Sequence, residues 1–328
     1  MTLKKADVQK YLEAFSKMKV LIIGDVMIDS YLIGKVNRIS PEAPIPIVSV
    51  SEREYRLGGA ANVALNIRAL GAKAFLCSII GKDEKGKIFK ELLTAKSLSD
   101  EGIIVSNSRK TTVKTRVISG GQHLLRVDDE HSHFVGNEIS NMLFNNVVKI
   151  IKTHKIDAII FEDYDKGVLS EELIVEIVAI AKEKNIPTCV DPKKNNFYFY
   201  KNVNLFKPNF KEFTEGTKSD IDKIKLDVLE THAKEFLINQ GIEILMITLS
   251  EQGIFIADKI QNLHLPAEIR DISDVSGAGD TVISVAALLL ASGASLKEIA
   301  NLSNIAGGLV CEKTGVVPID PKELLNEF

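Results

Sequence analysis

Two glycines and an aspartate near the C-terminal end of the sequence have the spacing of a phosphate-binding turn with a base beside it. Gly277, Gly279 and Asp280 lead directly into the apolar segment 282–291. Glycine lets backbone N–H groups turn toward one point, and the dipole of a helix that begins there favours negative charge. Phosphoryl transfer needs a site for negative charge and a base near the attacking hydroxyl. The segment predicts this chemistry, although a glycine-rich turn with Asp280 in a first helical turn is an equally good structural explanation.

A second group of small and polar residues has the composition of a sugar site. Asp25 and Asp29 follow the first predicted strand, and ligands of open parallel sheets bind outside the carboxyl ends of strands. Gly58 and Gly59 allow a ligand to approach the backbone, and the amide of Asn62 can both donate to and accept from sugar hydroxyls. The alternative is that the aspartates cap turns and that Asn62 caps a helix.

A third segment could hold a hydrated Mg²⁺ near phosphates. Asn209 and Glu212 are three residues apart, with Phe210 and Lys211 between them. At the start of a helix this spacing places an amide and a carboxylate on one side. The competing interpretation is a capping box, in which Asn209 is the N-cap and Glu212 the third helical residue.

Two shorter segments could complete a nucleotide site. Thr248 and Ser250 place hydroxyls beside a turn at Gly253, where they could meet phosphates or ribose, although hairpins use such residues routinely. Small residues around Asn304 predict either close packing of a helix or a shallow slot for adenine.

The composition excludes several functional classes. A chain of 328 residues with 45% hydrophobic residues can bury a large core. With 41 basic against 44 acidic residues the net charge is −3, so the excess of positive charge typical of a nucleic-acid-binding protein is missing.

The three cysteines, Cys77, Cys189 and Cys311, lie far apart in the sequence, which indicates reduced residues of the core. No apolar run approaches the roughly 18 residues of a membrane span, so we expect a cytoplasmic protein. Walker A and Gly-x-Ser-x-Gly motifs are absent, which argues against P-loop and hydrolase readings.

These residues must be positioned by alternating strands and helices. Strands are predicted at 20–23, 74–80, 157–161, 188–190, 203–206, 243–248 and 254–257. Helical segments between most of them imply parallel strands joined by crossovers, and hence a three-layer α/β/α sandwich in a single domain over 1–328. Two β-type excursions, at about 31–54 and 111–128, predict a small sheet. Such a sheet would act as a lid that keeps water from the reacting groups.

Four segments, taken in order, resemble the ribokinase-like (PfkB) family of carbohydrate kinases. They are 24–29, 58–62, 208–212 and 275–281, and the resemblance extends over essentially the whole chain. It implies a ribokinase-like fold and transfer of phosphate from ATP with Mg²⁺. It also implies that Asp280 is the catalytic base and that Gly277, Ala278 and Gly279 form the anion hole.

The resemblance assigns further residues by their positions in these motifs. The nucleotide and Mg²⁺ would be bound by Asn209, Phe210, Lys211, Glu212, Ser250, Gly253 and Asn304, and the hydroxyl of Thr248 is expected beside them from its place in the sequence. Sugar hydroxyls would be bound by Asp29, Gly59 and Asn62, with Gly58 expected beside them. A monovalent cation such as K⁺ would be bound by Asp274, Ser276 and Gly315. Family members pair through similar lids, which implies a homodimer.

Within the family the resemblance is strongest to kinases of a heptose 7-phosphate, at 38–46, 58–64, 163–167 and 191–193. It implies phosphorylation of D-glycero-D-manno-heptose 7-phosphate at its anomeric hydroxyl, on the way to ADP-heptose for lipopolysaccharide. Many such relatives carry a second, nucleotidyl-transferring half. Because the sequence ends at Phe328 without a His-x-Gly-His motif, we expect the kinase step alone. The alternatives are a kinase of ribose, fructose or a nucleoside, and a sugar-binding sensor without catalysis.

A phosphorylated substrate needs a cation at the end of its pocket remote from ATP, and Lys193 is the first candidate. It follows a predicted strand in Asp191-Pro192-Lys193, where side chains reach the ligand crevice and Pro192 stiffens the turn. The structural explanation is a solvated lysine on a loop. The other cations that could bind the same phosphate are Arg116, Arg126 and Lys166.

Overall fold

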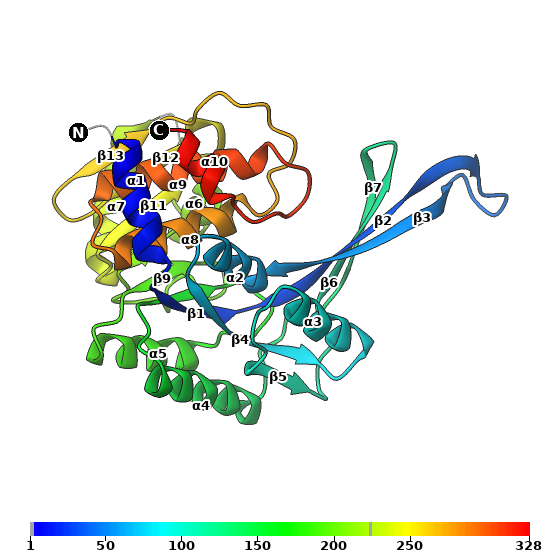
Figure 1. Cartoon of the computed structure of the whole chain (residues 1–328), viewed down its shortest axis with the longest axis horizontal. Helices are drawn as coiled ribbons and strands as arrows, with labels where there is room; N and C mark the ends of the chain where they lie inside the picture. The colour runs from blue at the N-terminus through cyan, green and yellow to red at the C-terminus, as the bar shows by residue number, and fades with distance from the viewer. Residues whose placement is uncertain (1–2, 223–224) are drawn as a thin grey trace.

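The computed structural model describes residues 3–222 and 225–328, and within them nine strands form one twisted sheet (Figure 1). In spatial order the strands are β13 (Asn262–Leu265), β12 (Ile254–Ala257), β11 (Ile244–Thr248), β10 (Leu205–Phe206), β9 (Thr188–Asp191), β8 (Ala158–Glu162), β1 (Lys19–Gly24), β4 (Lys73–Gly81) and β5 (Gly102–Ser106). Every pairing from β11 to β5 is parallel, and β12 is antiparallel to both of its neighbours. The predicted, mainly parallel α/β sheet is confirmed.

Helices cover both faces of this sheet. Val20 and Ile22 of β1 pack into one apolar cluster, whereas Leu21 and Ile23 pack into the other. A strand with both faces buried reads as a continuous apolar run, as β1 does. The first cluster includes residues of α1 (Lys5–Phe15), α2 (Ala60–Ala69), α3 (Glu84–Ala95), α8 (Ala278–Ala291), α9 (Leu296–Cys311) and α10 (Pro321–Asn326). The second includes residues of α4 (Asn137–Thr153), α5 (Glu171–Glu183), α6 (Phe210–Thr217) and α7 (Leu226–Gln240).

A second, four-stranded sheet forms the lid and projects from the body as a long arm (Figure 1). Its order is β3 (Pro46–Gly59), β2 (Val26–Ile39), β6 (Val113–Ser119) and β7 (Gln122–Asp129). The two predicted excursions are therefore strands of one lid, but β2 and β3 extend beyond 31–54 at both ends. As a consequence, Asp25 follows β1 as expected, whereas Asp29 lies inside the lid strand β2.

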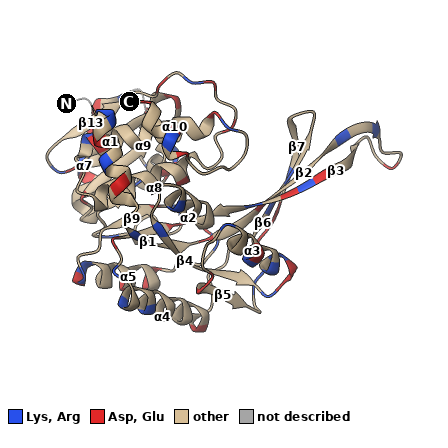
Figure 2. Cartoon of the chain, viewed as in Figure 1, with Lys and Arg blue, Asp and Glu red and all other residues tan. Residues whose placement is uncertain are grey.

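Lys and Arg alternate with Asp and Glu along the outer helices and the lid, as the colours of the ribbon in Figure 2 show. All three cysteines are buried and none forms a disulfide. Among the described residues, no helix combines the length and the apolar character needed to cross a membrane.

Candidate active site

Asp280 lies in the first turn of α8 and is held by two donors from different parts of the chain. Its side chain accepts hydrogen bonds from Nδ2 of Asn62 at 2.7 Å and from the hydroxyl of Tyr164 at 2.8 Å. The helix begins after Gly277, whose φ of 83° suits glycine, and a Cβ there would lie 2.9 Å from Nδ2 of Asn62. The turn therefore both starts the helix and makes room for the amide that orients the carboxylate.

The electrostatic surroundings of Asp280 suit a proton acceptor. Burial raises the pKa of its carboxyl group to about 6, against the opposing effect of the hydrogen bonds from Asn62 and Tyr164. The nearby carboxylate of Asp191 raises this pKa as well, and Lys207 lowers it. A carboxylate with such a pKa is ionised at neutral pH and is a stronger base than an exposed aspartate.

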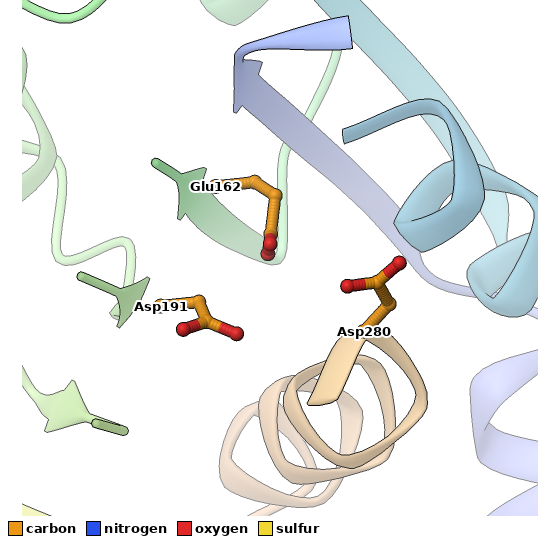
Figure 3. A group of neighbouring side chains, drawn as sticks. All are labelled: Glu162, Asp191 and Asp280. Carbon is orange, nitrogen blue, oxygen red and sulfur yellow. The ribbon is translucent and has the colours of Figure 1, made fainter. Parts of the chain in front are cut away.

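Three carboxylates converge at the centre of the site (Figure 3). Glu162 at the end of β8, Asp191 at the end of β9 and Asp280 on α8 each place one oxygen within 4.8 Å of the others, and all three are buried. Lys207, which is 3% exposed, pairs with Asp191 at 2.7 Å. The sequence analysis did not assign Glu162 or Lys207 to the site. Both lie at the carboxyl end of a strand, where ligands of parallel sheets bind, so the argument used for Asp25 and Lys193 would also have found them.

A cavity of about 790 Å³ opens beside Asp280. Its lining includes the glycine-rich turn and most residues that the sequence assigned to a nucleotide, namely Asn209, Glu212, Thr248, Ser250, Gly253, Asn304, Gly277, Ala278, Gly279 and Asp280. Phe210 and Lys211 do not line it: Phe210 packs against the second apolar cluster, and Lys211 is 81% exposed and pairs with Glu215. Asn209 and Asn304, which are more than 90 positions apart in the sequence, thus line the same cavity.

The helix cap at Asn209 and Glu212 is present. Oδ1 of Asn209 accepts from the backbone N–H of Glu212, and Oε2 of Glu212 accepts from the backbone N–H of Asn209, both at 2.8 Å. The other carboxylate oxygen of Glu212 accepts from the ammonium group of Lys193. The capping interpretation is confirmed, and Glu212 still borders the cavity.

Lys193 lines the same cavity as the glycine-rich turn, and its side chain extends toward the start of α6. Its Nζ contacts Glu212 and is 3.7 Å from Oδ1 of Asp191, while the ring of Tyr164 lies 5.4 Å away. The strand-end rule placed Lys193 in the crevice correctly. It could not say toward which end of the crevice a long side chain would extend.

The expected sugar-binding residues meet where the lid joins the body. Asp29 is 3% exposed, and a Cβ on Gly58 would lie 2.2 Å from its Oδ2. Gly59 has a φ of 60° and passes close to the backbone oxygen of Asp25, which leaves no room for a side chain. Oδ1 of Asn62 is buried and has no hydrogen-bond partner within the described residues, so it can accept from a ligand hydroxyl.

The lid supplies cations on the same side. Arg116 donates to Oδ1 of Asp29, and Arg126 lies directly opposite Arg116 on the neighbouring strand. Arg126 is 59% exposed and pairs with Asp128 at 3.0 Å. The remaining candidate, Lys166, pairs with Glu130 at 2.7 Å.

The three residues suggested for a monovalent cation are joined by one carboxylate. Oδ1 of Asp274 accepts from the backbone N–H of Ser276 at 2.9 Å, and its Oδ2 accepts from that of Gly315 at 3.0 Å.

Two residues that the sequence assigned to the nucleotide also have structural roles. Asn304 donates to the backbone oxygen of Pro266 at 2.8 Å, and a Cβ on Gly253 would lie 2.0 Å from the backbone oxygen of Leu265.

Comparison with known sequences and structures agrees with this geometry. The sequence profile described as "pfkB family carbohydrate kinase" matches residues 17–323. The chain is 36% identical over 321 residues to the bifunctional protein HldE of Syntrophotalea carbinolica, covering 98% of this chain and 65% of that protein. It is 40% identical over 314 residues to the bifunctional protein HldE of Desulfatibacillum aliphaticivorans, covering 94% and 63%. The chain thus spans just under two thirds of the length of these relatives.

Solved structures share the fold at low sequence identity. Phosphofructokinase-2 from Escherichia coli in complex with potassium superposes with a TM-score of 0.77 at 18% identity, covering 94% of this chain and 98% of that one. Arabidopsis thaliana ribokinase complexed with ribose and ATP superposes with a TM-score of 0.70 at 14% identity, again covering 94% and 98%.

Proposed function

Because the chain belongs to the pfkB family of carbohydrate kinases, we propose that it transfers the γ-phosphate of ATP to the anomeric hydroxyl of D-glycero-D-manno-heptose 7-phosphate. The product is the 1,7-bisphosphate, which would lead to ADP-heptose for lipopolysaccharide. The observation that carries the kinase chemistry is the oriented carboxylate of Asp280, which borders a cavity large enough for a nucleotide.

In this mechanism Asp280 takes the proton of the attacking hydroxyl. Asn62 and Tyr164 hold the carboxylate in place, so that its position does not have to be organised during the reaction. The backbone N–H groups at the start of α8 point toward the negative charge that develops on the transferred group. Lys207 adds a positive charge beside Asp191 at the same end of the cavity.

The nucleotide occupies the cavity that Ser250, Gly253 and Asn304 line, with its phosphates toward the glycine-rich turn. Glu212 lines this cavity and would hold Mg²⁺ through water, and the ion would supply positive charge to the phosphates of ATP. Binding of the phosphates would release Lys193 from Glu212, because an ammonium ion near a phosphate gains a stronger partner.

The sugar phosphate binds between Asp280 and the lid. The carboxylate of Asp29 and the free Oδ1 of Asn62 accept from sugar hydroxyls. The 7-phosphate extends toward Arg116 and Arg126, which share one face of the lid. Arg116 is already paired with Asp29 and Arg126 with Asp128, and two neighbouring guanidinium groups can still donate to a phosphate, which supports a phosphorylated substrate.

The choice of the heptose rests on the motif resemblance at 38–46 and 163–167 and on relatives named bifunctional protein HldE at 36 and 40% identity. A coupled assay of ADP release tests it, with heptose 7-phosphate, free heptose, fructose 6-phosphate, ribose and adenosine as acceptors. We expect the highest kcat/KM for heptose 7-phosphate. If the enzyme prefers ribose, fructose 6-phosphate or adenosine, then the acceptor is that compound and not the heptose. If the protein binds a sugar but phosphorylates none of them, it is a sensor.

We also propose that two copies pair through the lid. Its arm leaves large apolar side chains more than half exposed, among them Ile39 at 58%, Ile45 at 57% and Leu125 at 59%. Exposed apolar groups gathered on one projecting element are typical of a protein interface. Light scattering on the wild type should give the mass of a dimer, and Leu125→Glu should shift it toward the monomer.

K⁺ is proposed to bind near Asp274, Ser276 and Gly315, because the Asp274 carboxylate already draws the two loops together. The test is turnover in potassium salts compared with sodium and tetramethylammonium salts at equal ionic strength. Equal rates in all three would exclude a specific monovalent site.

A further inference from the structure

Glu130 directly follows β7, the last strand of the lid, and two lysines from different parts of the chain hold its carboxylate. Oε2 accepts from Nζ of Lys114 on β6 at 3.0 Å, and Oε1 accepts from Nζ of Lys166 at 2.7 Å. We propose that this carboxylate occupies the place of the acceptor's phosphate until the acceptor binds, and that the phosphate then displaces Glu130 from both lysines. The inference rests on the proposed function only in that the acceptor carries a phosphate.

Lys114 lies on the face of the lid that carries the proposed sugar site. It is directly beside Asp29 in the pairing of β6 with β2, and Arg116, two residues further along β6, donates to the carboxylate of Asp29. Residues two apart on a strand point to the same face of a sheet. A phosphate that reaches Arg116 therefore has Lys114 as the next cation along the same strand.

Glu130 holds the two lysines as a phosphate oxygen would. The side chains of Glu130, Lys114 and Lys166 are each no more than 21% exposed. Burial raises the pKa of Glu130, but the hydrogen bonds from Lys166 and Lys114 outweigh burial and lower this pKa below its usual value. The carboxylate is therefore ionised at neutral pH. Its charge-assisted hydrogen bonds to two ammonium groups are of the kind that lysines make to phosphate.

The charge balance favours a phosphate over the carboxylate in this place. The cations that gather here are Lys114, Arg116, Arg126 and Lys166, and the carboxylates paired with them are Asp29, Asp128 and Glu130. Four positive and three negative charges leave a charge of +1. A phosphate monoester carries about −1.5 to −2 at neutral pH. Exchanging it for the single charge of Glu130 brings the balance close to zero.

The loop that carries Lys166 is anchored by its backbone, so its side chain is able to change partners locally. The backbone N–H of Lys166 donates to Asp25 at 3.1 Å, and the backbone oxygen of Lys166 accepts from Arg109 at 2.5 Å. Tyr164, on the same loop, is held by Asp25 as well and donates to Asp280. The exchange therefore requires a rotation of the Glu130 side chain and leaves the residues around the proposed base in place.

This arrangement makes Glu130 a specificity-determining residue. A neutral sugar has no anionic group that displaces Glu130, so both lysines stay paired with the protein's own carboxylate. An acceptor with a phosphate releases the carboxylate to solvent and takes over both ammonium groups. The cost of displacing Glu130 is subtracted from the affinity for every phosphorylated acceptor, and a variant without this charge should bind phosphate more tightly.

Binding of inorganic phosphate to the full-length protein tests the exchange, without nucleotide or sugar, through the dependence of the Tm on phosphate concentration. Glu130→Gln keeps the shape of the side chain and removes the competing charge. Its apparent Kd for phosphate should be lower than that of the wild type by about threefold or more, the scale of one partly exposed ion pair. Adding Lys166→Met to Glu130→Gln should abolish this gain, which places the phosphate at the lysines and not at the glycine-rich turn.

Asp129→Asn is the matched control, because it removes the same charge one residue away, from an exposed pair with Lys110. Its Kd for phosphate should equal that of the wild type. If Glu130→Gln binds phosphate no more tightly than the wild type, or if Asp129→Asn shows the same gain, the exchange does not occur.

Steady-state kinetics provide a second measurement. Glu130→Gln should lower the KM for the sugar phosphate and leave the KM for ATP unchanged. A raised KM for the sugar phosphate would show that Glu130 organises the lysines for the phosphate, which contradicts the exchange. Because the phosphate titration uses neither sugar nor ATP, a wrong choice of acceptor would alter the kinetics and leave the titration unaffected.

Discussion

The hydroxyl of Tyr164 donates a 2.8 Å hydrogen bond to Oδ1 of Asp280, across a separation of 116 residues in the sequence. The position of Tyr164 is set in turn by Asp25, whose Oδ2 accepts from the backbone N–H of Tyr164 at 2.9 Å. The same carboxyl group also accepts from the backbone N–H groups of Lys166 and Val168, both at 3.1 Å. Asp25 therefore braces the loop that carries Tyr164, and Tyr164 orients the proposed base.

Removing this hydroxyl should slow the reaction without weakening nucleotide binding. We expect Tyr164→Phe to lower kcat by about 10- to 100-fold, the effect of losing one hydrogen bond to a charged group worth about 1.5–3 kcal/mol. The KM for ATP should change little, since Tyr164 acts through Asp280. Steady-state kinetics separate the two parameters, and a variant that raised the KM for ATP while keeping kcat would show that Tyr164 serves nucleotide binding instead.

Asp280→Asn keeps the shape of the side chain but removes its ability to accept a proton. Turnover should fall by about 10²- to 10⁴-fold, while calorimetry should still detect ATP binding. Near-normal turnover would falsify the assignment of Asp280 as the base.

Gly279 offers a test of the anion site that leaves the fold intact. A Cβ added there would have its nearest contacts at 3.6 Å, to Asp191 and Lys207, which is ordinary van der Waals separation. Gly279→Ala should therefore unfold near the wild-type temperature but show reduced kcat, because the methyl group stands between the phosphate and the backbone. Unchanged kcat would indicate that the phosphate does not approach the turn at this residue.

Glu212→Gln distinguishes the two roles of this side chain. Glutamine can replace glutamate in the capping box with Asn209, so the Tm should stay close to that of the wild type. Loss of the negative charge should raise the Mg²⁺ concentration needed for half-maximal activity. A Mg²⁺ titration and thermal unfolding measure the two effects. A lowered Tm with an unaltered Mg²⁺ titration would show that Glu212 serves only in the helix cap.

Arg116 and Lys193 are expected to affect different substrates, because Lys193 lines the proposed nucleotide cavity whereas Arg116 lies on the lid and donates to Asp29. Arg116→Met should raise the KM for the sugar phosphate and leave the KM for ATP nearly constant, while Lys193→Met should do the reverse or lower kcat. Each variant serves as the control for the other in the same assay. If Lys193→Met raised only the KM for the sugar phosphate, the phosphate of the acceptor would lie at Lys193 after all.

Features with local causes could be predicted from the sequence alone. The start of α8 depends on Gly277 and its neighbours, the cap of α6 depends on Asn209 and Glu212, and β1 is recognisable as a buried strand because its residues are apolar without interruption. Each of these depends on backbone conformations and hydrogen bonds within a few residues. The alternation of such strands with helices predicted the mainly parallel sheet, and the two β-type excursions at about 31–54 and 111–128 predicted the lid.

Only the tertiary structure decided which of these residues meet. Glu162, Asp191 and Asp280 become neighbours because β8 and β9 pair in parallel and α8 packs across them, and the sequence between them does not encode that approach. The direction of Lys193 toward Glu212, and the pairing of Arg116 with Asp29, depend on rotamers of long side chains selected by distant partners. The local sequence determines whether a segment forms a strand or a helix, whereas the packing of these elements against one another determines which charged side chains meet.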